Sequence, residues 1–259
     1  MVLVFDIGNT QVTVGLFEKD EVVGCWSVSS DEKKTADEYG ITLRMLLKNN
    51  LAGKASLEGV VICSVVPGLT PVFEKAAKSY FSCSALIISS KLNLPMKILV
   101  DYPKEVGADR LANAVAVQKL GYTPAIVIDM GTATTFDVVD SSGGYWGGVI
   151  APGMEISIQS LAKKTTQLPK IELNVPQNAL GRNTRECIVS GIYWGTIGQI
   201  KEIIQRLQTE LSPQIGGREF KVVLTGGLSS LVTPNLEKVY LVDPYLTLRG
   251  IKFIWDTNH

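Results

Sequence analysis

The chain of 259 residues contains almost no histidine: its one imidazole belongs to His259, the last residue. Chain ends are poorly held, so we do not expect this side chain to serve as a general base, a triad member or a metal ligand. Carboxylates are the other common groups for proton transfer. Any acid–base chemistry is therefore expected to rest on aspartate or glutamate.

The sequence also lacks an excess of either charge. Its 25 basic and 25 acidic side chains give a net charge of zero, whereas nucleic-acid binders normally carry a basic excess. No apolar stretch approaches the roughly 18 residues that a membrane span needs. We therefore expect no nucleic-acid partner and no membrane partner.

Cysteine pairs and an export signal are missing as well. The four cysteines, at positions 25, 63, 83 and 187, form no Cys-x-x-Cys pair, which argues against a zinc ribbon and against a disulfide scaffold. The apolar start of the chain is interrupted by Asp6 and has no basic region before it, unlike a signal peptide. Free cysteines without an export signal indicate the reducing cytoplasm.

What the sequence does contain is an alternation of strand and helix patterns. An apolar run at 2–5, a glycine turn and an alternating stretch predict three strands before residue 30. Thr35 and Glu38 form a capping box, which predicts a helix over the residues that follow. The further elements expected here are a strand at 59–66, a helix that Thr70 caps and that ends near Phe81, a strand at 86–88, and a helix from Glu105 to about Lys119. This order is typical of an α/β domain.

The start of this pattern recurs 123 residues later. Asp6-Ile7-Gly8-Asn9-Thr10 and Asp129-Met130-Gly131-Thr132-Ala133-Thr134 both end a buried strand and lead into a returning strand. We predict an internal duplication, with an N-terminal half over residues 1–116 and a C-terminal half over 117–259, packed tightly around a cleft. Each half is expected to hold a mixed β-sheet led by a β-hairpin and flanked by helices. The elements expected in the second half include helices near 153–164 and 183–211, strands at 221–224 and 239–242, and a last helix from about Tyr245.

The two hairpin turns have the chemistry of a metal–phosphate site. Glycine lets the backbone approach a ligand closely, and successive N–H groups of a tight turn form a concavity that binds anions. Thr10, Thr132 and Thr134 would add hydroxyl donors. Asp6 and Asp129 would repel phosphate unless a cation lay between them. The alternative is that each turn is an ordinary hairpin with a solvated aspartate, and we favour the site because the arrangement occurs twice.

Two shorter segments add weaker signals. The strand at 222–227 (VVLTGG) ends in two glycines, which suits a planar base or a ribose but also an ordinary strand-to-helix turn. Gly107-Ala108-Asp109-Arg110 opens a helix that has an apolar face. Asp109 could be a helix cap beside a solvated arginine, or it could accept a proton from a substrate hydroxyl while Arg110 binds an anionic group.

These segments resemble the motifs of a known group of ATP-binding proteins. DIGNT (6–10), DMGTATTFD (129–137) and LTGG (224–227) resemble the two phosphate motifs and the adenosine motif of the acetate and sugar kinase, heat-shock chaperone and actin superfamily. With GADR (107–110), GGVIAPG (147–153), LGRNT (180–184) and DPYLTLRGI (243–251), they closely resemble the type III pantothenate kinase family. The resemblance runs from residue 6 to about residue 251 without a departure at a motif position. GADR followed by DMGTATT is its most specific part.

The resemblance implies a duplicated actin-like (ribonuclease H-like) fold and ATP-dependent phosphorylation of pantothenate to 4′-phosphopantothenate, the first step of coenzyme A synthesis. It also implies Mg²⁺, a monovalent cation (K⁺ or NH₄⁺) and a homodimer. Asp109 would be the catalytic proton acceptor, Asp6 would act near Mg²⁺ without a direct bond to it, and Asp129 would bind the monovalent cation. The ATP site would comprise Asp6, Ile7, Gly8, Asn9, Thr10, Gln11, Val12, Thr13 and Thr132. The pantothenate site would comprise Tyr102, Gly107, Ala108, Asp109, Arg110 and Thr184.

Three other functions share parts of this pattern. Another kinase of the superfamily, acting on a sugar or a short acid, would have both turns but would not require GADR. A nucleotide-binding regulator would be expected to lose Asp109 or one turn, or to carry a basic face. A phosphatase of the same fold is the remaining alternative.

Overall fold

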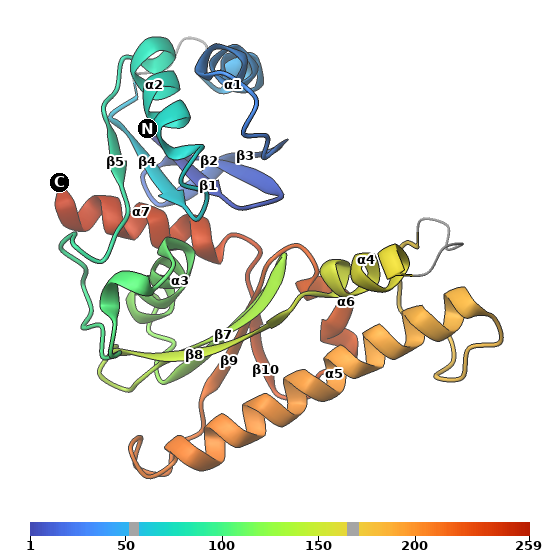
Figure 1. Ribbon diagram of the computed structural model, residues 1–259. Helices are drawn as coiled ribbons and strands as arrows, with labels where there is room; N and C mark the ends of the chain where they lie inside the picture. The colour runs from blue at the N-terminus through green and yellow to red at the C-terminus, as the bar shows by residue number, and fades with distance from the viewer. Residues whose placement is uncertain (52–56, 165–170) are drawn as a thin grey trace. The chain divides into compact units, whose positions relative to one another are not determined.

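The computed structural model describes residues 1–51, 57–164 and 171–259 (Figure 1). These residues form two compact units. Met1–Leu120 and Tyr245–His259 make up the first unit, and Gly121–Pro244 makes up the second. Each unit is built on one five-stranded sheet that contains both parallel and antiparallel pairs.

The sheet of the first unit has the strand order β3-β2-β1-β4-β5. The strands β1, β2 and β3 pair antiparallel, whereas β1, β4 and β5 run parallel. The strands are β1 (Val2–Ile7), β2 (Gln11–Glu18), β3 (Glu21–Ser29), β4 (Gly59–Ser64) and β5 (Ala85–Ile87). The helices are α1 (Ala36–Leu51), α2 (Thr70–Phe81), the 3₁₀ turn η1 (Pro103–Glu105), α3 (Ala108–Lys119) and α7 (Leu246–Asn258).

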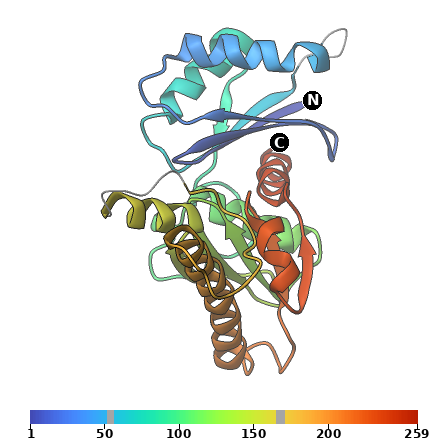
Figure 2. The ribbon, with the colours of Figure 1, turned by 90° about the vertical axis from the view of Figure 1, so that its right-hand side faces the viewer.

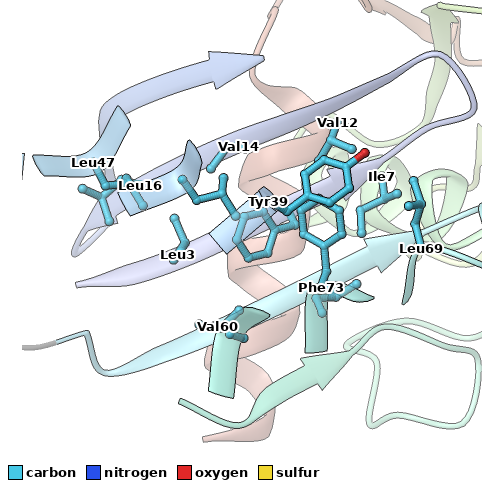
Figure 3. Packing of buried hydrophobic residues seen from close by; sticks show 14 of the residues in the cluster. Leu3, Ile7, Val12, Val14, Leu16, Tyr39, Leu47, Val60, Leu69 and Phe73 are labelled. Atoms are coloured by element: carbon cyan, nitrogen blue, oxygen red, sulfur yellow. The ribbon is translucent and has the colours of Figure 1, made fainter. Parts of the chain in front are cut away.

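Helices cover both faces of this first sheet. Alternate residues of a strand point to opposite faces. Leu3, Phe5 and Ile7 pack in a cluster with side chains of α1 and α2 (Figure 3), whereas Val2 and Val4 pack in a second cluster with α3 and α7. In Figure 2 the blue helix α1 and the red helix α7 lie on opposite sides of the sheet. Burial on both faces explains why β1 begins as a continuous apolar run and does not alternate.

The second unit repeats the topology of the first. Its strand order, β10-β9-β6-β7-β8, places β6 to β10 in the positions that β1 to β5 occupy in the first unit. The strands are β6 (Ala125–Met130), β7 (Ala133–Val139), β8 (Tyr145–Pro152), β9 (Lys221–Thr225) and β10 (Val239–Val242). The helices are α4 (Met154–Lys164), α5 (Thr184–Leu211), α6 (Ser229–Val232) and the 3₁₀ turn η2 (Thr233–Asn235). Ile126, Ile128 and Met130 of β6 pack in one core with Tyr193 and Ile197 of α5. The predicted duplication is confirmed.

The last helix, α7, packs within the first unit. Gly250 lets α7 approach α3 closely, since a Cβ at this position would overlap the carbonyl of Ala112. The hydroxyl of Thr247 donates to Oδ1 of the buried Asn113 at 2.8 Å. The expected halves, 1–116 and 117–259, differ from these units in two ways, because residue 116 lies inside α3 and α7 returns to the first unit. Sequence periodicity shows that a helix has an apolar face but not which sheet that face covers.

Most element boundaries follow the expectations. The capping box is confirmed, because the Glu38 carboxylate accepts from the Thr35 N–H at 2.8 Å and the Glu38 N–H donates to the Thr35 hydroxyl at 3.3 Å. Two details were wrong: Leu69 is the N-cap of α2 in place of Thr70, and the helix expected from residue 105 begins at Ala108. Val106 is extended and separates η1 from α3. Of the helices that the structure describes, none is long and apolar enough to cross a membrane.

Candidate active site

The first hairpin turn comprises residues 8–11, between β1 and β2. The two strands pair as far as Ile7 and Val12, and the Gly8 N–H donates to the carbonyl of Gln11 at 3.0 Å. A Cβ on Gly8 would lie 3.1 Å from that same carbonyl oxygen. The chain therefore reverses over four residues, with glycine at the tightest point.

Polar groups gather at this first turn. Asn9, Thr10 and Gln11 are exposed. Asp6 lies one residue before the end of β1, is half-buried, and pairs across the hairpin with Thr13. The turn thus presents backbone and short polar side chains close to a carboxylate, as expected for a site that takes an anion together with a cation.

The second hairpin turn is one residue shorter. The strands β6 and β7 pair as far as Met130 and Thr134, which leaves residues 131–133 in the turn. The Gly131 N–H donates to the Ala133 carbonyl at 3.1 Å. Asp129 pairs with Thr135 as Asp6 pairs with Thr13, so the two aspartates occupy equivalent places.

Two glycines from other segments pack against the second turn. The Gly153 N–H donates to the Thr132 carbonyl at 3.2 Å, and a Cβ on Gly153 would overlap that carbonyl and lie 2.5 Å from the Gly131 oxygen. Gly226 follows β9 with a φ of 86°, and a Cβ there would lie 2.5 Å from Oδ1 of Asp129. Any side chain at either position would displace the turn or the carboxylate.

The shorter turn changes which threonine can face a ligand. Thr132 is half-buried within the turn, whereas Thr134 already belongs to β7 and is 1% exposed. The expectation that Thr134 donates its hydroxyl to a ligand is therefore wrong. Because strand pairing resumes one residue earlier than in the first unit, its side chain points into the core.

The carboxyl group of Asp109 lies in the first turn of α3. Gly107 is the N-cap of this helix, and Asp109 accepts a hydrogen bond from the Arg110 N–H at 2.8 Å. A Cβ on Gly107 would lie 2.5 Å from Oδ1 of Asp109, so glycine leaves room for the carboxylate. Burial raises the pKa of the Asp109 carboxyl, against the opposing effect of the Arg110 N–H and charge. A raised pKa suits a group that accepts a proton near neutral pH.

The Gly107–Arg110 segment lies near the end of β1 within the first unit. Val65 contacts both segments. Its N–H donates to the Ile7 carbonyl at 3.0 Å, and its side chain would lie 3.7 Å from a Cβ added to Gly107. Arg110 is half-buried, and its Nη2 atom is buried. Arg110 is therefore not a fully solvated charge, and Gly107, not Asp109, occupies the N-cap position of α3.

The remaining predicted substrate residues differ in exposure. Tyr102, the residue before η1, is 69% exposed, and Ala108 is buried at the start of α3. Thr184 is exposed and is the first residue of α5, in the second unit. Asn183 caps that helix by accepting from the Glu186 N–H at 2.9 Å. The structure therefore brings Gly107–Arg110 close to the first turn, while Thr184 belongs to the other unit.

The two aspartates can take part in cation binding only together with other ligands. Among the described residues, no three or more histidine, cysteine or acidic side chains gather as a metal site. Mg²⁺ commonly uses one or two carboxylates and takes its other ligands from substrate phosphates and water. The single carboxylates Asp6 and Asp129, each beside a glycine turn, fit that kind of site.

Sequence reasoning missed Ser30 as a residue that holds a turn, and it gave no such role to Gly153 or Gly226, although both belong to motifs that it named. Ser30, directly after β3, donates its N–H to the Thr10 carbonyl at 3.1 Å and its hydroxyl to the Gly8 carbonyl at 2.5 Å. Gly153 and Gly226 hold the second turn. Each of the three is the first residue after a strand, and that position was the one signal available in the sequence.

Comparisons with known proteins agree with the motifs. A family model described as type III pantothenate kinase matches residues 2–206. A type III pantothenate kinase from Dehalococcoides mccartyi is 43% identical over 253 residues, which cover 98% of this chain and 94% of that protein. Another from Moorella thermoacetica is 42% identical and covers both chains fully, and one from Brevibacillus brevis is 42% identical over 258 residues, with 99% of that protein covered.

Solved structures are similar in fold. A Campylobacter jejuni protein, described provisionally as a Baf family transcriptional activator, superposes with a TM-score of 0.61 at 18% identity, covering 99% of this chain and 98% of that one. A ROK family glucokinase from Streptomyces griseus gives a TM-score of 0.51 at 12% identity, covering 96% and 97%. The duplicated sheets and these neighbours confirm the actin-like fold of the chain.

Proposed function

This chain belongs to the type III pantothenate kinase family, and we propose that it transfers the γ-phosphoryl group of ATP to the primary hydroxyl of pantothenate. The product would be 4′-phosphopantothenate, formed in the first step of coenzyme A synthesis. The observation that carries this proposal is the Gly107–Arg110 segment at the start of α3, where Gly107 leaves room for the Asp109 carboxylate and the Arg110 N–H donates to it at 2.8 Å. A sugar kinase of the same fold would need the turns but not this segment.

We propose that the first turn binds the phosphates of ATP. The exposed residues Asn9, Thr10 and Gln11 would donate backbone and side-chain groups, and the neighbouring Ile7, Gly8, Val12 and Thr13 would shape the site. Asp6 would orient water bound to Mg²⁺. When bound, Mg²⁺ neutralises charge on the phosphoryl oxygens. Thr132 of the second turn would donate to a phosphate oxygen.

Asp109 would accept the proton of the pantothenate hydroxyl. Phosphoryl transfer depends mainly on positioning and electrostatics, and the hydroxyl proton leaves late. The raised pKa makes the carboxylate a stronger base than an exposed aspartate. Arg110 would bind the pantothenate carboxylate, with Tyr102, Gly107, Ala108 and Thr184 as further contacts.

Asp129 would bind a monovalent cation, K⁺ or NH₄⁺. Its place beside the second turn and against Gly226 supports a role in charge balance there. Activity should collapse when sodium is the only monovalent cation and return when potassium or ammonium is added. Full activity in sodium-only buffer would contradict the assignment.

We propose a homodimer that works in the cytoplasm. Gly191, Gly195 and Gly198 lie on the exposed side of α5, and a Cβ at each would meet nothing within 4 Å. Small residues let a second helix approach closely. All four cysteines, which the structure describes, are free thiols, as expected in a reducing compartment. Light scattering should give twice the mass of one chain, and Gly195→Leu should lower the measured mass toward that of one chain.

The direct test is phosphorylation of pantothenate by the purified protein. With ATP, Mg²⁺ and potassium, mass spectrometry should detect 4′-phosphopantothenate and a coupled assay should detect equal amounts of ADP. The Asp109→Asn protein, purified in the same way, controls for contaminating kinases. A panel of sugars and short acids tests the rival kinases. Faster phosphorylation of a panel member than of pantothenate would overturn the proposal.

A further inference from the structure

Ser30 makes two hydrogen bonds to the first turn from the end of β3. Its N–H donates to the Thr10 carbonyl at 3.1 Å, and its hydroxyl donates to the Gly8 carbonyl at 2.5 Å. Both bonds go to carbonyl oxygens of the turn, and they come from one half-buried residue. The two peptide groups are therefore fixed from the same side.

The orientation of a carbonyl also decides where the next N–H points. A trans peptide is planar, and its C=O and N–H point in opposite directions. Holding the Gly8 oxygen at Ser30 therefore turns the Asn9 N–H away from Ser30, and holding the Thr10 oxygen does the same for the Gln11 N–H. An anion on the side of the turn opposite Ser30 would then meet these two N–H groups and not the carbonyl oxygens.

The segment that carries Ser30 is itself held by a buried tyrosine. The Tyr39 hydroxyl accepts from the Asp31 N–H at 2.9 Å and donates to the Ser29 carbonyl at 3.0 Å. Tyr39 is 1% exposed, and its ring packs on Phe73 with the centroids 4.6 Å apart. Figure 3 shows its hydroxyl at the edge of the core, toward Val12. The residues on both sides of Ser30 are thus tied to the rigid core of the unit.

We propose that Ser30 is a positioning residue for the phosphates of ATP: by fixing the Gly8 and Thr10 carbonyls it aims the N–H groups of the first turn at the nucleotide. The proposal rests on the proposed function, since it assigns ATP to this turn. Ser30 touches neither substrate, and it acts through the turn. Tyr39 supports it one step further from the site.

The test separates ATP from pantothenate. Ser30→Ala removes the hydroxyl and keeps the backbone bond. It should lower kcat/KM for ATP about 2- to 12-fold, the worth of one hydrogen bond, while KM for pantothenate stays unchanged. Ser30→Thr keeps a hydroxyl and should restore most of the loss. Tyr39→Phe should act in the same direction on ATP alone.

The matched control is Ser29→Ala, the same change one residue earlier. Ser29 is exposed, and its backbone carbonyl, which Tyr39 bonds, is retained. It should behave as the wild type. Equal kcat/KM values for ATP in Ser30→Ala and Ser29→Ala would overturn the proposal. A rise in KM for pantothenate as large as the rise in KM for ATP would also overturn it, because it would indicate general damage to the fold.

Binding of a non-hydrolysable ATP analogue with Mg²⁺ distinguishes a failure of this inference from a failure of the proposed function. The measurement needs no pantothenate. Ser30→Ala should weaken binding by the same factor and Ser29→Ala should not. If the two variants differ in this way although the wild-type protein does not phosphorylate pantothenate, the positioning role of Ser30 stands and pantothenate is not the acceptor substrate. Unchanged analogue affinity would refute the positioning role.

Discussion

The two hairpin turns occupy equivalent places in equivalent sheets, yet they are held differently. In both units the residue after the third strand donates its N–H into the turn, from Ser30 to Thr10 and from Gly153 to Thr132. Ser30 adds a hydroxyl bond, whereas Gly153 has no room even for a Cβ. The longer first turn leaves space that a hydroxyl fills, and the shorter second turn packs backbone on backbone. A duplicated structure can thus keep its topology while the contacts that fix each copy diverge.

The helices that follow the last strand of each sheet differ as well. The helix after β5 is α3, which carries Asp109 at its second position, and the helix after β10 is α7, which carries Thr247 there. Asp109 is a desolvated carboxyl with a raised pKa, whereas the Thr247 hydroxyl donates to buried Asn113 of α3. One helix start thus carries a desolvated carboxyl, whereas the other makes a packing contact between α7 and α3.

The largest effect should come from Asp109, the proposed base, because only one of these helix starts carries such a carboxyl. Asp109→Asn should lower kcat by about 10²- to 10⁴-fold, the usual worth of a general base. The melting temperature should not fall, because asparagine still accepts the Arg110 N–H and no charge is left in the desolvated site. Turnover and thermal unfolding measured on one preparation check both parts.

The control for this variant is Asp37→Asn. Asp37 is also the second residue of a helix, α1, but it is exposed. Its variant should keep near-normal turnover. Near-normal turnover of Asp109→Asn itself would show that Asp109 is not the base.

The raised pKa of Asp109 gives the same comparison a pH dependence. A general base works when it is deprotonated, so if Asp109 has the proposed role, kcat/KM for pantothenate should fall as the pH falls through the raised pKa of its carboxyl. An ordinary aspartate titrates at about pH 4, and this fall should begin at a higher pH. The shift also favours folding of the protonated form, so its contribution to stability is lost as the pH rises through the folded pKa. In the pH profile of the residual activity of Asp109→Asn, this fall of kcat/KM at acidic pH (the acidic limb) should be missing. An unchanged limb would assign the titration to another group.

The sequence predicted the repeated elements because they depend on local patterns. The Asp-x-Gly turns after apolar strands and the Thr35–Glu38 capping box are visible without any tertiary contact. Thr134 could not be placed, because a turn one residue shorter moves a side chain to the other face of its strand. The roles of Ser30 and Gly153 were missed for a related reason, since both depend on strand register. The packing of α7 in the first unit depends on a long-range contact at Gly250.

Exchanging the residues that hold the two turns, Ser30 and Gly153, should give unequal losses of stability and of kcat/KM. Gly153→Ser places a side chain against the carbonyls of Gly131 and Thr132, and overpacking of this kind costs about 1–3 kcal/mol of stability. A shift of about 1 Å at the site can lower kcat/KM about 10²-fold. Ser30→Gly, the reverse exchange, leaves space and should cost far less in both assays. Equal losses from the two exchanges would show that the turns are held alike.

The smallest effect concerns a buried carboxyl that the first sheet lacks. Asp137 of β7 pairs with Val127, as Gly15 of β2 pairs with Val4. Gly15 sits against Leu248, whereas Asp137 accepts a hydrogen bond from the Tyr145 hydroxyl at 2.9 Å. Tyr145 and Asp137 are both fully buried, so the second sheet depends on a polar contact where the first depends on close packing.

Tyr145→Phe should therefore lower the free energy of unfolding by about 1–3 kcal/mol, the cost of losing one partner of a buried polar group. Denaturant unfolding with an unchanged m-value measures this loss. Tyr240→Phe removes the same hydroxyl from a side chain that is 53% exposed, and surface changes usually stay within about 0.5 kcal/mol. If the two variants were equally stable, the Asp137–Tyr145 bond would add nothing to the second sheet, and the contrast with Gly15 would be one of packing alone.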